Sequence, residues 1–282
     1  MSDEAAPQTT SESPRVAVIG GGVMGGTIIT AIRVAGWPAG GITVAEKDSA
    51  RASALQETHE IRATGSITEA VEGAEVIVIA VKPQDADAAL AEVASAYKPG
   101  ALVITVAAGL PAAFYESRLP DGAPVVRCMP NTPTIVARGA TAIAAGAYAS
   151  SQHLGIAEAM LRATGLVVTV AEEDLDAVTA VSGSGPAYFY AVVEALTEAG
   201  VAHGLDRTLA TQLAAQTFVG AAQLLMESGD TPQTLRRRVS SPGGTTIAAL
   251  DAMEHAGLQG VVSAGANAAA ARSKELAEEL GR

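Results

Sequence analysis

The segment at residues 240–246 has residue types that suit the binding of a carboxylate. It reads Ser-Ser-Pro-Gly-Gly-Thr-Thr, carries no charge and lies between two stretches with helical patterning. Its glycines free the backbone, and Thr245 and Thr246 then open a helix, where N–H groups and hydroxyls can converge on one anion. Taken alone, the segment is more simply explained as a capped turn between helices. Two other glycine-rich segments, at residues 20–25 and 182–186, favour the binding interpretation.

A nucleotide-binding loop is predicted near the start of the chain. Gly20, Gly22 and Gly25 form the pattern G-x-G-x-x-G, after an apolar strand at residues 15–19 and before a helical pattern that continues to residue 34. The first glycine permits a tight turn, the second lets a pyrophosphate approach, and the third lets helix and strand pack. This order of strand, turn and helix favours dinucleotide binding over a simple tight turn.

Charged residues after the second predicted strand, at residues 42–45, bear on the choice of cofactor. Glu46 lies about 20 residues beyond the loop, where an acid normally accepts hydrogen bonds from the adenosine ribose and favours NAD. Lys47 and Arg51 follow at once and could instead bind a 2′-phosphate. All three are also compatible with solvated loop charges. The sequence therefore leaves the choice between NADH and NADPH open.

Two further loops are expected at the same edge of the sheet. Residues 80–83 follow an apolar run at 75–81, and residues 107–109 follow another at 101–106. The carboxyl ends of strands in an open parallel sheet face the ligand crevice, so these loops are predicted to line the cofactor. Lys82 is compatible with that position and with a surface lysine.

The distribution of proton donors indicates which electrophile a reductase of this kind would take. No lysine lies between residues 99 and 273, and the helical region offers tyrosines, hydroxyls and backbone amides instead. Many hydroxyacid dehydrogenases use a lysine, histidine or tyrosine to move the proton on the carbonyl oxygen. The composition suits hydride delivery to an electrophile that already carries its proton, such as an iminium. The four histidines have no metal-ligand spacing, so no metal site is predicted.

Composition excludes several classes of partner. The 282 residues are 49% hydrophobic and 17% charged, with a net charge of −12, which argues against nucleic acid and anionic membranes. The single cysteine, Cys128, excludes an internal disulfide, fits a cytoplasmic location and is expected to be a buried structural thiol. Residues 1–13 are polar and acidic and are expected to form a disordered tail.

The chain is predicted to be an α/β protein with two domains. Apolar runs alternate with helical stretches over residues 14–172, which predicts a Rossmann-like, mainly parallel sheet with helices on both faces. Residues 173–282 contain no strand-like run and are expected to form an all-helical domain, which suits a bundle or a helical interface between subunits. Its helices carry apolar faces wider than one core could cover. The examples are Ala187, Val192, Val193, Leu196, Leu213, Ala214, Phe218, Ala221 and Leu225.

Five motifs in order resemble the pyrroline-5-carboxylate reductase family, and the likeness runs from residue 16 to about residue 276. Three of them are Ile-Gly-Gly-Gly-Val-Met at 19–24, Ala-Val-Lys-Pro-Gln at 80–84 and Ala-Val-Ser-Gly-Ser-Gly-Pro-Ala-Tyr at 180–188. The more specific two are Arg-Cys-Met-Pro-Asn-Thr-Pro at 127–133 and Ser-Pro-Gly-Gly-Thr-Thr-Ile-Ala at 241–248. The nucleotide loop alone is shared by many families, whereas the last two motifs together are not.

The resemblance implies that NAD(P)H reduces the cyclic imine of 1-pyrroline-5-carboxylate to L-proline, the last step of proline biosynthesis. It implies catalytic roles for Thr246, whose hydroxyl would sit against the ring nitrogen, and Ser241. The substrate carboxylate would be bound by Ser241, Gly244, Thr245 and Thr246. The cofactor would be bound by Gly20, Gly21, Gly22, Val23, Met24, Gly25, Glu46, Lys47, Ala80, Val81, Lys82, Pro83, Ala107, Ala108 and Gly109.

The resemblance also implies a homo-oligomer in which residues 173–282 form the helical dimerisation and substrate-binding domain. Members of the family build the site between two subunits with interlocking helical domains, and such dimers can associate into rings, up to a decamer. Glu46 departs from the family pattern, because members that prefer NADPH often have Ser, Thr or Arg there. Two alternatives to the predicted activity stay open: another imine or hydroxyacid reductase of the same architecture, and a non-catalytic dinucleotide-binding regulator. An absent mid-chain lysine argues against a hydroxyacid dehydrogenase, and the intact loop at 241–246 argues against a regulator.

Overall fold

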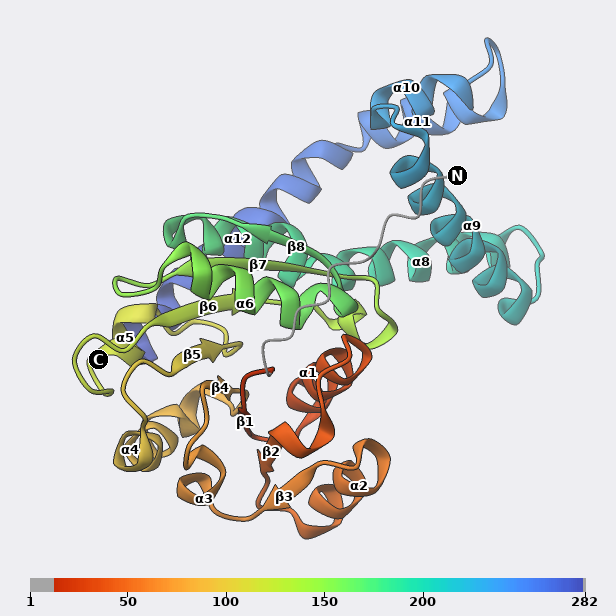
Figure 1. Cartoon of the computed structure of the whole chain (residues 1–282). Helices are drawn as coiled ribbons and strands as arrows, with labels where there is room; N and C mark the ends of the chain where they lie inside the picture. Colours follow the sequence, from red (N-terminus) through yellow and green to blue (C-terminus); the bar gives the residue numbers. More distant parts are fainter. Residues whose placement is uncertain (1–12, 281–282) are drawn as a thin grey trace, which may run out of the picture. The chain divides into compact units, whose positions relative to one another are not determined.

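The computed structural model of the protein describes residues 13–280, coloured along the chain in Figure 1. The tail expected at residues 1–13 lies outside the described residues, except for Ser13. Contacts divide the described chain into two compact units. Residues 13–183 and 271–280 form the first unit, and residues 184–270 form the second.

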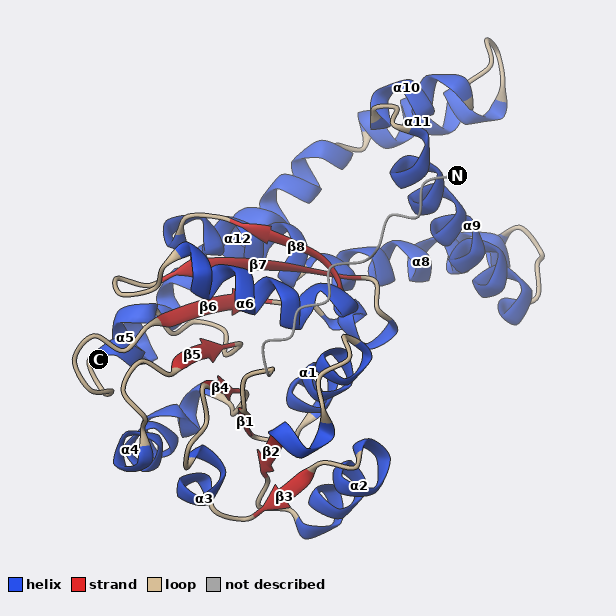
Figure 2. Cartoon of the chain, in the orientation of Figure 1, coloured by secondary structure: helices blue, strands red, loops and turns tan. Residues whose placement is uncertain are grey.

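The first unit is built on an eight-stranded sheet with the order β3-β2-β1-β4-β5-β6-β7-β8 (Figure 2). Neighbouring strands are parallel except for β6 and β7, which confirms the predicted mainly parallel sheet. The strands are β1 (Val16–Ile19), β2 (Ile42–Ala45), β3 (Arg62–Thr64), β4 (Val76–Ile79), β5 (Leu102–Thr105), β6 (Val125–Met129), β7 (Gly139–Ala145) and β8 (Gly165–Thr169). Every residue of β1, β4 and β5 is buried, as expected for central strands covered on both faces.

Helices cover both faces of this sheet. On one face, α1 (Val23–Val34) and α6 (Ser151–Leu161) bury Ile28, Ile32 and Met160 against alternate strand residues such as Val18 and Ile104. On the other face, buried side chains come from α3 (Ile67–Val71), α4 (Ala86–Ala96) and α5 (Ala112–Glu116). The period of two along the strands sends neighbouring residues into these two separate cores. The predicted doubly covered Rossmann-like sheet is therefore confirmed.

The second unit contains only helices among the described residues 184–270, as the sequence predicts. They are α8 (Gly185–Ala202), α9 (Arg207–Ser228), α10 (Pro232–Arg238), α11 (Thr245–His255) and the first part of α12 (Leu258–Leu280). The caps follow the expected chemistry: the Asp206 side chain accepts from the N–H of Leu209, and α9 ends at Gly229 with φ +69°. Within this unit, α8 and α9 pack together through Phe189 and Phe218, whose ring centroids lie 5.4 Å apart.

The division by contacts falls between Gly183 and Ser184. The domain boundary expected at residues 172 and 173 stays a prediction. Local packing explains the position of the division. Helix α7 (Leu175–Val178) buries Leu175 against Ala142 and Ala144 of β7. The end of α12 belongs to the same unit, because the Ser273 hydroxyl donates to a carboxylate oxygen of Asp176 at 2.6 Å. Helix α7 ends at Val178, and residues 179–183 continue it as a π-helical turn.

Candidate functional site

The glycine-rich loop has the tight geometry that its sequence predicts. Gly20 has φ +98° and donates its N–H to the Ala45 carbonyl at 2.9 Å. A Cβ on Gly20 would lie 3.0 Å from the Ala80 carbonyl oxygen, and one on Gly25 would lie 1.9 Å from the Gly20 carbonyl oxygen. Both positions therefore require glycine, Gly20 for the turn from β1 into α1 beside the end of β4, and Gly25 for the close packing of α1 on that turn.

The same loop leaves room and donors for an anion. A Cβ on Gly22 would have no atom within 4 Å, so open space lies beside the backbone there. Gly22 is the N-cap of α1 and makes no side-chain cap bond. Among the described residues, nothing accepts a hydrogen bond from the N–H groups of Val23, Met24 or Gly25. An uncapped helix start beside open space fits the pyrophosphate of a dinucleotide.

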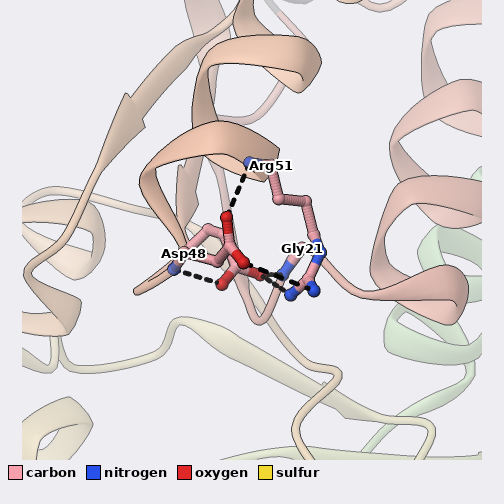
Figure 3. Close-up of polar contacts among 4 residues, drawn as sticks. Gly21, Asp48 and Arg51 are labelled. Atoms are coloured by element: carbon pink, nitrogen blue, oxygen red, sulfur yellow. Dashed lines mark hydrogen bonds and ion pairs between the residues drawn. The ribbon is translucent and has the colours of Figure 1, made fainter.

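Glu46 is not directed into solvent at the end of β2. Its side chain is 8% exposed, and it accepts from the N–H of Gly21 at 2.9 Å and from the N–H of Asp48 at 2.8 Å. Arg51 adds a third donor, with Nη1 3.1 Å from Oε2. Figure 3 shows Gly21, Asp48 and Arg51 converging at this point. Burial raises the pKa of Glu46, but the hydrogen bonds from Asp48, Arg51 and Gly21 outweigh it, so the pKa lies below its ordinary value and the carboxylate is ionised.

A hollow of about 410 Å³ brings several of the predicted cofactor residues together. It lies where the strand order reverses between β1 and β4, which is the expected position of a dinucleotide in such a sheet. The predicted residues that line it are Gly20, Gly22, Glu46, Lys47, Ala80, Val81 and Lys82. Arg51 lines it as well, while Gly21, Val23, Met24, Gly25, Pro83, Ala107, Ala108 and Gly109 do not.

The loop after β5 lies farther along the same carboxyl edge of the sheet. Thr105 and Ile79 are register partners in the parallel pair of β5 and β4, so both strands end at one level. The Ala107 N–H donates to the Thr105 hydroxyl at 3.3 Å, and Gly109 has φ +85°. Ala108 is exposed at this edge. The predicted lining role of residues 107–109 stays a prediction.

Substituting Gly25 by alanine is expected to disrupt the loop. Because the new Cβ would meet a backbone oxygen at 1.9 Å, we expect a loss of roughly 1–3 kcal/mol of stability and at least a tenfold weaker affinity for NADPH. Gly26→Ala is the matched control, because its Cβ would lie 3.7 Å from Leu55 and alanine favours helix. Denaturation curves and titration of NADPH fluorescence measure the two quantities. Normal NADPH affinity in Gly25→Ala would contradict the assigned loop.

In the second unit, residues 241–246 form a tight turn that opens α11. The Gly244 N–H donates to the Ser241 carbonyl at 3.0 Å, and Gly243 has φ +70°. A Cβ on Gly244 would lie 2.5 Å from the Ser241 hydroxyl oxygen, so this hydroxyl folds over the glycine. Gly243 is therefore required for its positive φ, and Gly244 is required because a side chain there would clash with Ser241.

This turn leaves polar groups without protein partners. Gly244 is the N-cap of α11 and supplies no side-chain cap. Among the described residues, nothing accepts a hydrogen bond from the N–H groups of Thr245, Thr246 or Ile247. The hydroxyls of Ser241, Thr245 and Thr246 likewise have no hydrogen-bond partner among the described residues. Thr246 is half-buried, whereas Ser241 and Thr245 are exposed. The arrangement is what binding of a small carboxylate requires.

Asn131 is a supporting residue that the sequence analysis quoted only as part of a motif. Its side-chain amide donates to the Ser182 carbonyl at 3.1 Å, and its side-chain oxygen accepts from the Ala140 N–H at 2.9 Å. A Cβ on Gly183 would lie 2.6 Å from the Met129 side chain. The Met-Pro-Asn segment therefore supports the end of the π-helical turn at residues 179–183, where the Ser-Gly-Ser-Gly-Pro segment begins.

A reactive cysteine, a metal-binding cluster or a membrane-spanning helix could also indicate function in the described chain. Cys128 is buried, which confirms the expected buried thiol, and burial raises the pKa of that thiol. No cluster that could hold a metal ion occurs among residues 13–280. In the same part of the chain, no helix is long and apolar enough to cross a bilayer.

Comparisons with known proteins agree with this arrangement. Residues 172–276 match the family model for pyrroline-5-carboxylate reductase dimerisation, and residues 15–109 match the model for coenzyme F420-dependent NADP oxidoreductase. The pyrroline-5-carboxylate reductase of Mycobacterium tuberculosis is 43% identical, covering 93% of this chain and 96% of its own. A structure of the Coxiella burnetii pyrroline-5-carboxylate reductase superposes with TM-score 0.89 and 33% identity, covering 93% of this chain and 98% of that one. The Plasmodium falciparum enzyme with NADP bound gives TM-score 0.81 and 28% identity, covering 94% and 99%.

Proposed function

The chain belongs to the pyrroline-5-carboxylate reductase family, and we propose that its activity is the NAD(P)H-dependent reduction of 1-pyrroline-5-carboxylate to L-proline. The observation that carries this proposal is the near full-length identity of 43% to a reductase, together with two uncapped helix starts in this chain. One of them follows the dinucleotide-type loop, and the other follows the Ser-Pro-Gly-Gly turn. A regulator without turnover would have no need of the second.

The dinucleotide supplies a hydride when bound. Gly22, Val23 and Met24 would bind its pyrophosphate through backbone N–H groups, and residues 80–83 and 107–109 would line the rest. The substrate carboxylate would be bound by the N–H groups at the start of α11 and by the hydroxyls of Ser241 and Thr245. Catalysis is then mainly positioning, since a clamped carboxylate fixes the imine carbon for hydride transfer.

The proton balance of the reaction places little demand on the protein. If the ring nitrogen of the imine enters protonated, addition of hydride to the imine carbon would leave the former π electron pair of the C=N bond as the lone pair of a neutral amine. Water can then supply the proton that completes the ammonium group of proline. The Thr246 hydroxyl would sit against this nitrogen and hold the ring as its charge falls. No lysine is required, which accords with the absence of lysine between residues 99 and 273.

The test is to follow the absorbance of NADH or NADPH after addition of pyrroline-5-carboxylate and to measure proline in the same samples. We expect stoichiometric proline formation with at least one cofactor. Turnover of a 2-keto acid but not of the imine would favour a hydroxyacid reductase. Cofactor binding without turnover of either substrate would favour a regulator.

The assembly and location of the enzyme extend the proposal. Residues 172–276 belong to a dimerisation family, so the second unit carries a subunit interface. Association of such dimers into a larger ring, up to a decamer, is proposed from the family resemblance. A cytoplasmic location is proposed because a single buried cysteine and a biosynthetic reduction by NAD(P)H fit a reducing compartment.

A further inference from the structure

We infer that Arg51, rather than Glu46, sets the preference between NADPH and NADH, and that Glu46 is a positioning residue for both cofactors. The inference rests on the proposed reductase function and concerns the adenosine end of the dinucleotide. It departs from the usual role of an acid after the second strand, which is to accept from the ribose hydroxyls and so select NADH.

The first step is that the hydrogen-bonding capacity of Glu46 is already largely used inside the protein. Its Oε2 accepts from the Gly21 N–H and from Arg51 Nη1, and its Oε1 accepts from the Asp48 N–H, all within 3.1 Å. The side chain is 8% exposed. A Cβ on Gly21 would lie 3.1 Å from Oε2, so the loop and the carboxylate are in direct contact. Glu46 therefore holds the glycine loop, which serves NADH and NADPH alike.

The second step is that the negative charge of Glu46 is compensated. Arg51 lies at hydrogen-bond distance from it, and three hydrogen bonds together hold its pKa below the ordinary value. A lone carboxylate would repel a 2′-phosphate, but a carboxylate paired with a guanidinium repels it far less. This acid therefore does not exclude NADPH.

The third step is that Arg51 has donors to spare. A guanidinium carries five N–H donors, and Nη1 donates one to Glu46, while Nη2 lies 3.9 Å from the Asp48 carboxylate. Its side chain is 49% exposed and lines the hollow between β1 and β4 beside the exposed Lys47. The Asp48 side chain caps α2 (Ser49–His59) by accepting from the Arg51 N–H at 2.9 Å, which fixes the backbone that carries the guanidinium. A planar, fixed donor group suits a phosphate.

The experiment measures equilibrium binding of NADPH and NADH by nicotinamide fluorescence, with no imine substrate present. In Arg51→Gln we expect NADPH affinity to fall about ten- to a hundredfold relative to NADH affinity, as loss of a charge-assisted contact implies. Arg51→Lys keeps the positive charge but loses the planar set of guanidinium donors, so the ratio of NADPH to NADH affinity should lie between those of wild type and Arg51→Gln. Arg62→Gln, an exposed arginine of β3 that does not line the hollow, is the control for the same change of net charge.

Glu46→Gln separates the two roles of the acid. As a positioning residue it should weaken both cofactors by about five- to tenfold and leave their ratio within about threefold of wild type. In turnover assays it should raise KM for both cofactors with little change in kcat, whereas a general folding defect would lower kcat through the active fraction.

Three results would overturn the inference. They are a shift of at least tenfold toward NADPH in Glu46→Gln, an unchanged ratio in Arg51→Gln, and a larger shift in Lys47→Gln than in Arg51→Gln. Because binding is measured without pyrroline-5-carboxylate, a chain that fails to make proline can still confirm or contradict this assignment. Failure of the proposed function is therefore distinguishable from failure of the inference.

Discussion

Replacement of Thr246 by alanine is expected to lower kcat/KM for pyrroline-5-carboxylate by about ten- to a thousandfold, equivalent to roughly 1.4–4 kcal/mol of lost polar stabilisation. Thr246 lies in the first turn of α11, half-buried, and no described residue bonds its hydroxyl. A polar group held without a protein partner at a helix start is available to the substrate. Cofactor affinity should stay near wild type, because Thr246 is assigned to the substrate and is not among the predicted cofactor-binding residues.

The alternative explanation of Thr246 is that it merely caps a helix, and the structure supplies a control for that. The N-cap of α11 is Gly244, and no side-chain cap is present. Thr231, by contrast, is a true N-cap, because its hydroxyl accepts from the Thr234 N–H at 3.2 Å. Thr231→Ala should cost about 1 kcal/mol of stability and leave kcat/KM unchanged. Normal turnover in Thr246→Ala, measured as initial rates at several imine concentrations, would remove Thr246 from the site.

The sheet and the long helices were predictable because their signals are local. β1, β4 and β5 are uninterrupted apolar runs, and strands buried on both faces have few other sequence solutions. The loops that follow them are placed by topology, since parallel strands end at one edge. The starts of α9 and α10 can also be predicted from the sequence, because the side chains of Asp206 and Thr231 cap these helices by accepting from N–H groups two to three residues further along the chain.

The features that the sequence did not predict depend on contacts between distant segments. β3 is a three-residue strand that joins the sheet by pairing with β2 and has no apolar run of its own. Residues 174–181 have a helical pattern, but residues 179–183 form a π-helical turn. The side-chain amide of Asn131, about 50 residues earlier, donates a hydrogen bond to the Ser182 carbonyl in this turn.

Glu46 shows the same limit within the candidate site. Its position in the sequence identifies it as an acid at the end of β2. Only the fold shows that the Gly21 N–H, 25 residues earlier, and the Arg51 guanidinium both bond its carboxylate. The type of residue was thus predictable and its role was not, because a carboxylate can accept from a ribose or from its own loop with equal ease.

Separation of the subunits is expected to abolish activity. Of the nine apolar residues singled out on the predicted helices, Ala214 alone is buried; Val193, Phe218 and Leu225 are half-buried and the other five are exposed. Further exposed side chains on α8 and α9 include Phe189 at 56%, Val219 at 58% and Met226 at 78%. Such a density of exposed apolar groups on two adjacent helices is typical of an obligate interface and not of an isolated subunit. Since the loop at 241–246 belongs to the same unit, a subunit without its partner should lose the ordered substrate site.

Leu213→Glu puts this to the test, because Leu213 is 52% exposed on α9 and a buried unpaired carboxylate opposes association. We expect the wild type to sediment as a dimer or larger at low micromolar concentration, and the variant to shift toward the mass of one 28.2 kDa chain with at least a hundredfold loss of kcat/KM. Val34→Glu is the matched control: Val34 is 73% exposed at the end of α1 in the first unit, so this variant should sediment like the wild type. A fully active wild-type species at the mass of one chain would mean that the exposed faces of α8 and α9 serve some purpose other than completing the catalytic unit.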